Sequence, residues 1–286
     1  MDTKLTPLNN NHPIESLRGD YIFDYDKLNL FAESHKDAYK NGTPFPHIVI
    51  DDFIDDAVAD KLIAGFPPAN PSLQERDNSS WADQNGRVAA QTGKLGIRND
   101  REFDPFVRHC LWEMMSQPFV LFLEKLTGIS NLLTDPRMLG GGTHQTLSGG
   151  LLRVHADFNI HRIYNLDRRL NLIIYLNKNW KEEYGGHLEL WDKELTRCEK
   201  SLLPINKRCV IFSTGSETWH GHPHPLTCPE GMARRSLALY YYTNGRPENE
   251  TRPRHKTLWP MLPGEEDLWG DDVNKDEISE GKSINT

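Results

Sequence analysis

The sequence predicts a mainly β protein with flanking helices, in which a sandwich or barrel of short strands packs against N-terminal helices. After residue 135, short apolar or alternating runs recur roughly every ten to twenty residues and are separated by Gly, Asn, Asp and Pro. Several such runs within about a hundred residues favour a sandwich or barrel. The expected strands lie near residues 151–155, 170–176, 187–191, 201–204, 208–213, 218–220 and 235–243.

The helices are expected before this strand-rich region. Apolar residues recur at helical spacing through 105–126, and Pro118 divides that stretch because proline can begin a second helix at its first turn. Gly128 should end the second helix. Further upstream, 46–54 indicates a short strand that leads into an amphipathic helix with Asp55 as its N-cap.

Two kinds of segment are expected to be irregular. Residues 69–101 are rich in Asn, Asp, Ser and Arg and show little periodicity, so they are predicted to form a long loop of the kind that often acts as a lid. The glycine-rich segments 140–142 and 149–150 are expected to be turns and bulges, because no helix pattern follows that could cradle a phosphate.

The chain therefore divides into four predicted parts. Residues 1–20 form a polar leader, and 263–286 form an acidic tail too hydrophilic to order itself. Residues 21–135 contain a strand, helices and the loop excursion, and they pack on a β core formed by residues 136–262.

Composition limits the function classes. Of 286 residues, 37% are hydrophobic and 26% charged, as in an ordinary globular protein. The formal net charge of −8 argues against a nucleic-acid partner, which usually needs a basic face. Arg168-Arg169 and Arg234-Arg235 are the candidates for a local basic patch.

Cysteine usage and hydropathy indicate a reduced compartment. The four cysteines are scattered and form no C-x-x-C pair, which argues against a cysteine-only zinc site and against a disulfide framework. The N-terminus lacks the order of charges and apolar residues of a signal peptide, and no run approaches 18 apolar residues. We therefore expect a cytoplasmic protein without a membrane span.

The most informative motif is His155-Ala156-Asp157 at the end of an expected strand. Residues i and i+2 of an extended chain point to the same face, so His155 and Asp157 can present an imidazole and a carboxylate to one point. A third ligand must come from another strand, and His220 follows the strand at 208–213, with His222 as an alternative. Two histidines and one carboxylate suit iron(II), because three coordination positions remain open.

An isolated His-x-Asp occurs often by chance, and the runs that follow it carry the argument. They are a buried strand with a polar turn at 171–180, a glycine turn entering a strand at 185–190, and a last strand at 234–242. With the N-terminal run 44–53, the stretch from about 150 to 245 resembles the 2-oxoglutarate and iron(II)-dependent dioxygenase superfamily, within it the prolyl-4-hydroxylase-like branch. The letters IYLNKNW and the glycine pair that follows are similar to the hypoxia-sensing prolyl hydroxylases.

The resemblance implies a double-stranded β-helix (jelly-roll) as the catalytic core over residues 136–262, with iron bound by His155, Asp157 and His220. The implied cofactors are Fe(II), 2-oxoglutarate as co-substrate, and O2. Related halogenases carry a small residue in place of the aspartate, so the presence of Asp157 favours hydroxylation, with desaturation as the alternative.

The resemblance also implies a site for the far carboxylate of 2-oxoglutarate. Arg234 would form a salt bridge with it, because a guanidinium pairs with a carboxylate through two hydrogen bonds. Tyr175 would donate a hydrogen bond to the same group. Arg235 is the alternative to Arg234, although the spacing of Arg234 and Ser236 resembles the Arg-x-Ser site common in the superfamily.

The expected reaction is hydroxylation of an unactivated C–H bond of a small molecule, such as an amino acid or another metabolite, while 2-oxoglutarate is decarboxylated to succinate. A small molecule is preferred because the 69–101 excursion of this single domain could close over a pocket. Hydroxylation of a prolyl or other residue in a protein or peptide is the alternative within the class. A non-catalytic jelly-roll binding module is the alternative from another class.

Overall fold

The computed structural model describes residues 21–69 and 90–262. The expected leader, most of the expected excursion and the expected acidic tail lie outside the described residues. The helices are α1 (Tyr25–Lys40), α2 (Asp56–Ala64), α3 (Pro105–Met114) and α4 (Gln117–Thr127). The strands are β1 (His47–Ile50), β2 (Gln91–Ile97), β3 (Leu133–Thr134), β4 (Gly142–His155), β5 (Asp167–Tyr175), β6 (Leu188–Trp191), β7 (Cys198–Leu202), β8 (Cys209–Ser213), β9 (His220–His222) and β10 (Ala233–Thr243).

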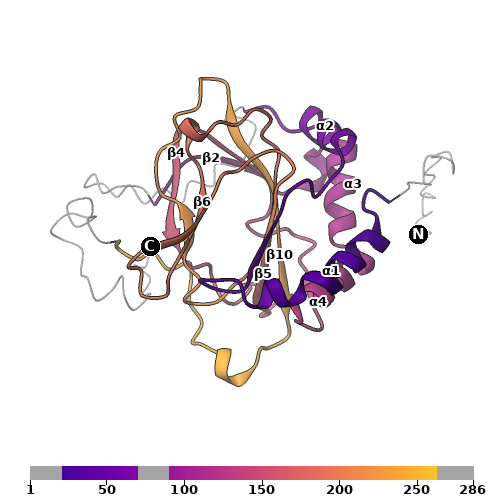
Figure 1. The fold of residues 1–286 in the computed structure, drawn as a ribbon, viewed down its shortest axis with the longest axis vertical. Helices are drawn as coiled ribbons and strands as arrows, with labels where there is room; N and C mark the ends of the chain where they lie inside the picture. Colours follow the sequence, from indigo (N-terminus) through magenta and orange to yellow (C-terminus); the bar gives the residue numbers. More distant parts are fainter. Residues whose placement is uncertain (1–20, 70–89, 263–286) are drawn as a thin grey trace, which may run out of the picture.

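The strands form one curled antiparallel sheet in the order β1-β8-β5-β10-β4-β9-β6-β7, with β2 added to β4 and β3 added to β10. Strand β4 changes partner along its length: residues 142–147 pair with β10, whereas Leu152 and His155 pair with β9. The sheet thereby folds over on itself, and Figure 1 shows the strands enclosing the interior of a barrel. This is the expected double-stranded β-helix, and the predicted fold class is confirmed.

The helices cover the outer face of the half-barrel that contains β5 and β10 (Figure 1). Side chains from α3 and α4 pack in one buried cluster with Leu172 and Ile174 of β5 and with Leu237 of β10. Tyr241 donates a hydrogen bond of 2.8 Å to the Met114 carbonyl at the end of α3. Because successive residues of a strand face opposite sides, the residues between these apolar ones point into the barrel. No helix among the described residues is long and apolar enough to cross a lipid bilayer.

Several predictions from the sequence are confirmed in detail. The stretch 105–126 forms α3 and α4, and α4 ends at Gly128 in the left-handed conformation. Residues 46–54 contain β1, and Asp55 is at the N-cap of α2, although its side chain makes no capping hydrogen bond. Seven expected strands correspond to β4–β10, although β7 overlaps the expected 201–204 only at 201–202 and β9 overlaps the expected 218–220 only at His220.

Three elements differ from expectation. Residues 91–97, within the expected loop excursion, form β2, whose letters QTGKLGI lack apolar alternation and which gains its hydrogen bonds from β4. Strand β4 begins at Gly142 instead of near residue 151, and the bulge in its pairing with β2 lies beside the expected irregularity at 149–150. Helix α1 was not anticipated; Asp24 caps it by accepting a hydrogen bond from the Lys27 amide.

Gly142 allows β2 to approach β4 closely. Its φ is +97°, and a Cβ on this residue would lie 2.1 Å from the Ile97 carbonyl oxygen. Gly149 is a matched comparison, because its φ is +77° but a Cβ there would meet nothing within 4 Å.

We predict that Gly149→Ala lowers the free energy of unfolding by about 1–2 kcal/mol through backbone strain alone. Gly142→Ala should cost about 1–3 kcal/mol more, because it adds a steric conflict to the strain. Denaturant unfolding of both variants measures the difference. Equal losses would mean that the β2–β4 contact at Gly142 contributes nothing to stability.

Candidate active site

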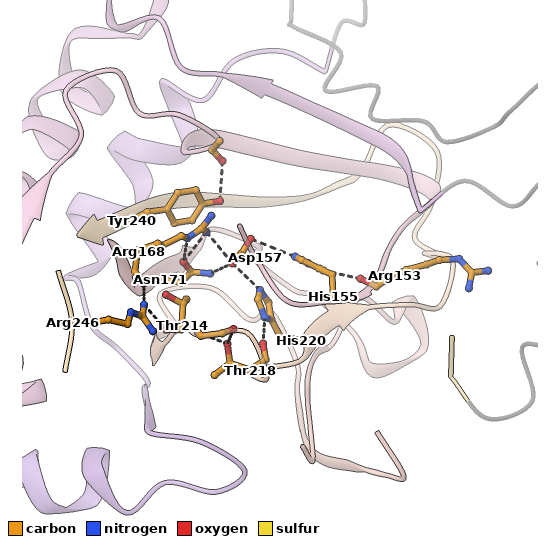
Figure 2. A network of polar contacts seen from close by, with 12 residues as sticks. Arg153, His155, Asp157, Arg168, Asn171, Thr214, Thr218, His220, Tyr240 and Arg246 are labelled. Carbon is orange, nitrogen blue, oxygen red and sulfur yellow. Dashed lines mark hydrogen bonds and ion pairs between the residues drawn. The ribbon is translucent and has the colours of Figure 1, made fainter. Parts of the chain in front are cut away.

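The three expected metal ligands lie together inside the barrel. His155, the last residue of β4, is paired directly with His220, the first residue of β9, and their rings are 4.5 Å apart. Asp157 follows β4, and its Oδ1 lies 3.7 Å from His155 Nε2, while its Oδ2 lies 3.4 Å from His220 Nε2. One ligand atom from each residue lies within 4.8 Å of the others. Figure 2 shows the three side chains converging from two strands.

Both imidazoles are held in the orientation that a metal requires. His155 Nδ1 is 2.8 Å from the Arg153 carbonyl oxygen, and His220 Nδ1 is 2.9 Å from that of Thr218. A carbonyl oxygen only accepts, so each Nδ1 carries the proton and each Nε2 keeps its lone pair for the shared point. Burial, together with the nearby His220, lowers the pKa of His155, which favours the neutral ligand form.

Asp157 is ionised although it is enclosed. Burial opposes its ionisation, but Arg168 and the two histidines outweigh burial and hold the Asp157 pKa well below its usual range. Its Oδ2 forms an ion pair with Arg168 Nη2 at 2.9 Å and accepts a hydrogen bond from Asn171 Nδ2 at 2.8 Å (Figure 2). Two imidazoles and one carboxylate form the facial donor set that suits non-haem iron(II), so the residues present fit this metal.

The expected carboxylate-binding pair also lies inside the barrel. Arg234 is only 7% exposed, and its Nη2 donates to the Tyr175 hydroxyl at 3.0 Å. Its Nε donates to the Gly186 carbonyl at 2.7 Å, and a Cβ on Gly186 would lie 2.9 Å from the arginine Cδ, so glycine is needed there. Burial raises the pKa of Tyr175, which keeps its phenol protonated and able to donate a hydrogen bond.

The two alternatives left open by the sequence lie elsewhere. Arg235 points to the opposite face of β10, where its Nε is 3.3 Å from Gln145 Oε1 and its guanidinium lies over Phe66. His222 is buried and pairs with Leu152 along the strand, but it does not join the cluster of three ligands. The geometry therefore favours Arg234 and His220 for the predicted roles.

Neither arginine pair forms a basic patch. Arg168 points into the barrel toward Asp157, whereas Arg169 points outward and pairs with Glu250 at 3.1 Å. All four arginines of the two pairs are buried or half-buried. The expectation that a basic patch might lie at these pairs is therefore wrong, and strand alternation is the reason.

Sequence reasoning missed the segment that covers the outer side of the ligands. Ala156, between the two ligands of the His-x-Asp motif, exchanges backbone hydrogen bonds of 3.0 and 2.8 Å with Leu258. The indole of Trp259 consequently lies against the His155 ring, with centroids 4.9 Å apart. Asn159 binds the same segment at Pro253 and His255. No local pattern in 251–262 indicates this contact, because it is made between backbones.

Comparison with known protein families identifies the core. Residues 142–242 match the model of the 2OG-Fe(II) oxygenase superfamily. A search among curated proteins finds no match for this chain.

Solved structures share the fold at low identity. A prolyl hydroxylase from Trichoplax adhaerens, solved with a peptide fragment of the hypoxia-inducible factor oxygen degradation domain, is similar over 81% of this chain and 94% of its own, with 17% identity and a TM-score of 0.52. A prolyl 4-hydroxylase from Phytophthora capsici covers 79% of this chain and 68% of its own at 16% identity and a TM-score of 0.49. HygX from Streptomyces hygroscopicus, bound to nickel, 2-oxoglutarate and hygromycin B, is similar over 82% of this chain and 96% of its own, with 9% identity and a TM-score of 0.44. The similarity to the Trichoplax adhaerens enzyme shows a shared fold. The other two TM-scores are below 0.5 and do not establish one.

The family match over residues 142–242, on a fold shared with a prolyl hydroxylase, defines the class: this chain contains a 2OG-Fe(II) oxygenase domain. It is therefore an enzyme that depends on iron(II) and 2-oxoglutarate, with a fold of the prolyl-4-hydroxylase-like branch.

We predict that Arg234→Met raises the dissociation constant for 2-oxoglutarate about 10- to 100-fold, because hydrogen bonds to a charged group contribute about 1.5–3 kcal/mol. Arg235→Met is the matched control and should change it less than about threefold. Anaerobic titration of the metal-loaded protein with 2-oxoglutarate measures both constants. A larger loss in the Arg235 variant would assign the co-substrate to the other face of β10.

Proposed function

We propose that this protein hydroxylates an unactivated C–H bond of a small molecule, such as an amino acid or another metabolite. In the balanced reaction, the substrate, 2-oxoglutarate and O2 yield the hydroxylated product, succinate and CO2. The convergence of His155, Asp157 and His220 on one buried point, with a buried arginine inside the same barrel, is the observation that carries the proposal.

Each residue has a defined part in this proposal. His155 and His220 would hold the metal through Nε2, while each Nδ1–H donates to a backbone carbonyl. Arg234 and Tyr175 would orient 2-oxoglutarate by its far carboxylate. Bound iron(II) supplies the oxidising chemistry with 2-oxoglutarate and O2, and the protein supplies orientation and a dry interior. Asp157 would occupy the third ligand position, which leaves no place there for a halide ion and favours hydroxylation.

The segment 251–262 supports a small substrate. It crosses the His-x-Asp motif at the Ala156–Leu258 bridge and places Trp259 against His155. It is also held at His255, whose Nε2 lies 2.7 Å from the Ser216 hydroxyl. An enclosed metal site limits the size of what can reach it. The fold shared with a prolyl hydroxylase solved with a peptide keeps a peptidyl residue as the second candidate substrate.

We predict that anaerobic addition of iron(II) and 2-oxoglutarate produces a visible charge-transfer band, because both would bind to the same centre. A non-catalytic binding module would stay colourless.

With O2, succinate release should be stimulated by a pool of metabolites more than by a peptide library. Asp157→Gly should abolish hydroxylation. Stimulation by peptides alone would reverse the order of the two candidate substrates.

Replacing Trp259 tests whether segment 251–262 encloses the site. Trp259→Ala should raise the fraction of 2-oxoglutarate that is decarboxylated without hydroxylated product, because water gains access beside His155. Trp112→Ala is the control, since Trp112 is 50% exposed on α3, on the helix side of the fold. The ratio of product to succinate is the measurement. An unchanged ratio in the Trp259 variant would mean that this segment does not shape the site.

A further inference from the structure

Arg168 is a buried cation beside the metal ligands. It is the second residue of β5, and only 1% of its surface is exposed. Its Nε and Nη2 donate to Asn171 Oδ1 at 3.1 and 2.8 Å, and Nη2 also lies 2.9 Å from Asp157 Oδ2. Asn171 in turn donates to that same Oδ2 at 2.8 Å. Arg168, Asn171 and Asp157 thus form a closed ring of contacts, which Figure 2 shows.

Aromatic rings hold the guanidinium of Arg168 in place. Its central carbon lies 3.5 Å from the centre of the Tyr240 ring and 4.7 Å from that of Phe158. Tyr240 is itself fixed, because its hydroxyl donates to the Gly140 carbonyl at 2.8 Å. A desolvated cation over an aromatic face is attracted by the negative potential of the ring. Arg168 is therefore packed where it can act on Asp157 but cannot reach a substrate in solvent.

The two donors distinguish the oxygens of Asp157. By distance to the imidazoles either oxygen could serve a metal, since Oδ1 lies 3.7 Å from His155 Nε2 and Oδ2 lies 3.4 Å from His220 Nε2. The ion pair with Arg168 and the hydrogen bond from Asn171, however, are both made with Oδ2. Oδ2 therefore already has two partners within the chain.

We propose that Arg168 is a positioning residue that, together with Asn171, occupies Asp157 Oδ2 and so makes Asp157 a one-oxygen metal ligand through Oδ1. The inference rests on the proposed function of this site. Coordination through both oxygens would take a fourth position on the metal. Coordination through Oδ1 alone leaves three positions, two for the keto acid and one for O2.

The same contact compensates the charge of Asp157. An ionised carboxylate enclosed by protein is strongly destabilising unless a cation and hydrogen bonds compensate it. Arg168 and Asn171 provide that compensation from within the chain and fix the orientation of the carboxylate.

The test compares Arg168→Met and Arg168→Lys with Arg169→Met in the full chain, using cobalt(II) as a spectroscopic probe. Arg169 is the matched control, because it is the next residue of β5 and is also buried in an ion pair, but it faces away from the site. Cobalt(II) affinity and the visible cobalt(II) spectrum, which reports coordination number, are the two readouts. Thermal unfolding shows that each variant is folded.

We expect Arg168→Met to weaken cobalt(II) binding about 10- to 100-fold, as loss of a partner of a metal ligand usually does. Its spectrum should change, because Oδ2 becomes free to bind. Arg168→Lys keeps the positive charge but loses the planar guanidinium. Its cobalt(II) affinity and spectrum should therefore lie between those of Arg168→Met and those of the parent. Arg169→Met should match the parent in both readouts.

An Arg168→Met variant with the parent affinity and spectrum would overturn the inference. Tighter binding would also overturn it, because Arg168 would then be only a repelling charge. If Arg168→Met does not fold, Arg168→Lys is the deciding variant. A cobalt(II) spectrum of Arg168→Lys identical to that of the parent would refute the positioning role of Arg168. If the parent binds cobalt(II) no better than His155→Ala, the proposed function fails instead.

Discussion

Strand β4 belongs to both halves of the barrel, and the position of the site depends on its change of partner. Its first part pairs with β10 and its last part with β9. Because one strand makes both pairings, His155 arrives opposite His220, while the strand that carries Arg234 closes the other half of the same interior. A register shift beside 149–150 accommodates the bend. Strand β4 thus connects the part of the barrel that holds the three candidate ligands with the part that holds Arg234.

The interior of the barrel contains charged side chains that are largely shielded from water. Asp157 is matched by Arg168 through an ion pair and by Asn171 through a hydrogen bond. The two imidazoles are held in place because each Nδ1–H donates to a backbone carbonyl. The donor atoms of the three residues therefore point to one place (Figure 2). Such preorganisation removes the cost of orienting ligands when the metal binds.

Strand periodicity explains which parts of this site could be predicted from sequence. The i, i+2 rule places His155 and Asp157 on one face, and the same rule separates Arg234 from Arg235. It could not identify Arg168 as the partner of Asp157, because adjacent arginines look alike until the strand's inner face is known. Strand β2 was missed because QTGKLGI has no alternating apolar pattern, and its pairing comes from β4. The Ala156–Leu258 bridge connects backbones a hundred residues apart, which leaves no local signal.

Arg168 and Arg234 both point into the barrel, but their charges are compensated differently. The difference is in line with an anionic co-substrate at Arg234. Arg168 is paired with the carboxylate of Asp157. Arg234 is held by neutral groups, the Gly186 carbonyl and the Tyr175 hydroxyl, and among the described residues no carboxylate lies within 4 Å of it. A buried cation without an acidic partner carries a desolvation cost. An anionic ligand that binds there would remove this cost. In the proposed role of Arg234, the binding of 2-oxoglutarate would therefore also stabilise the folded barrel.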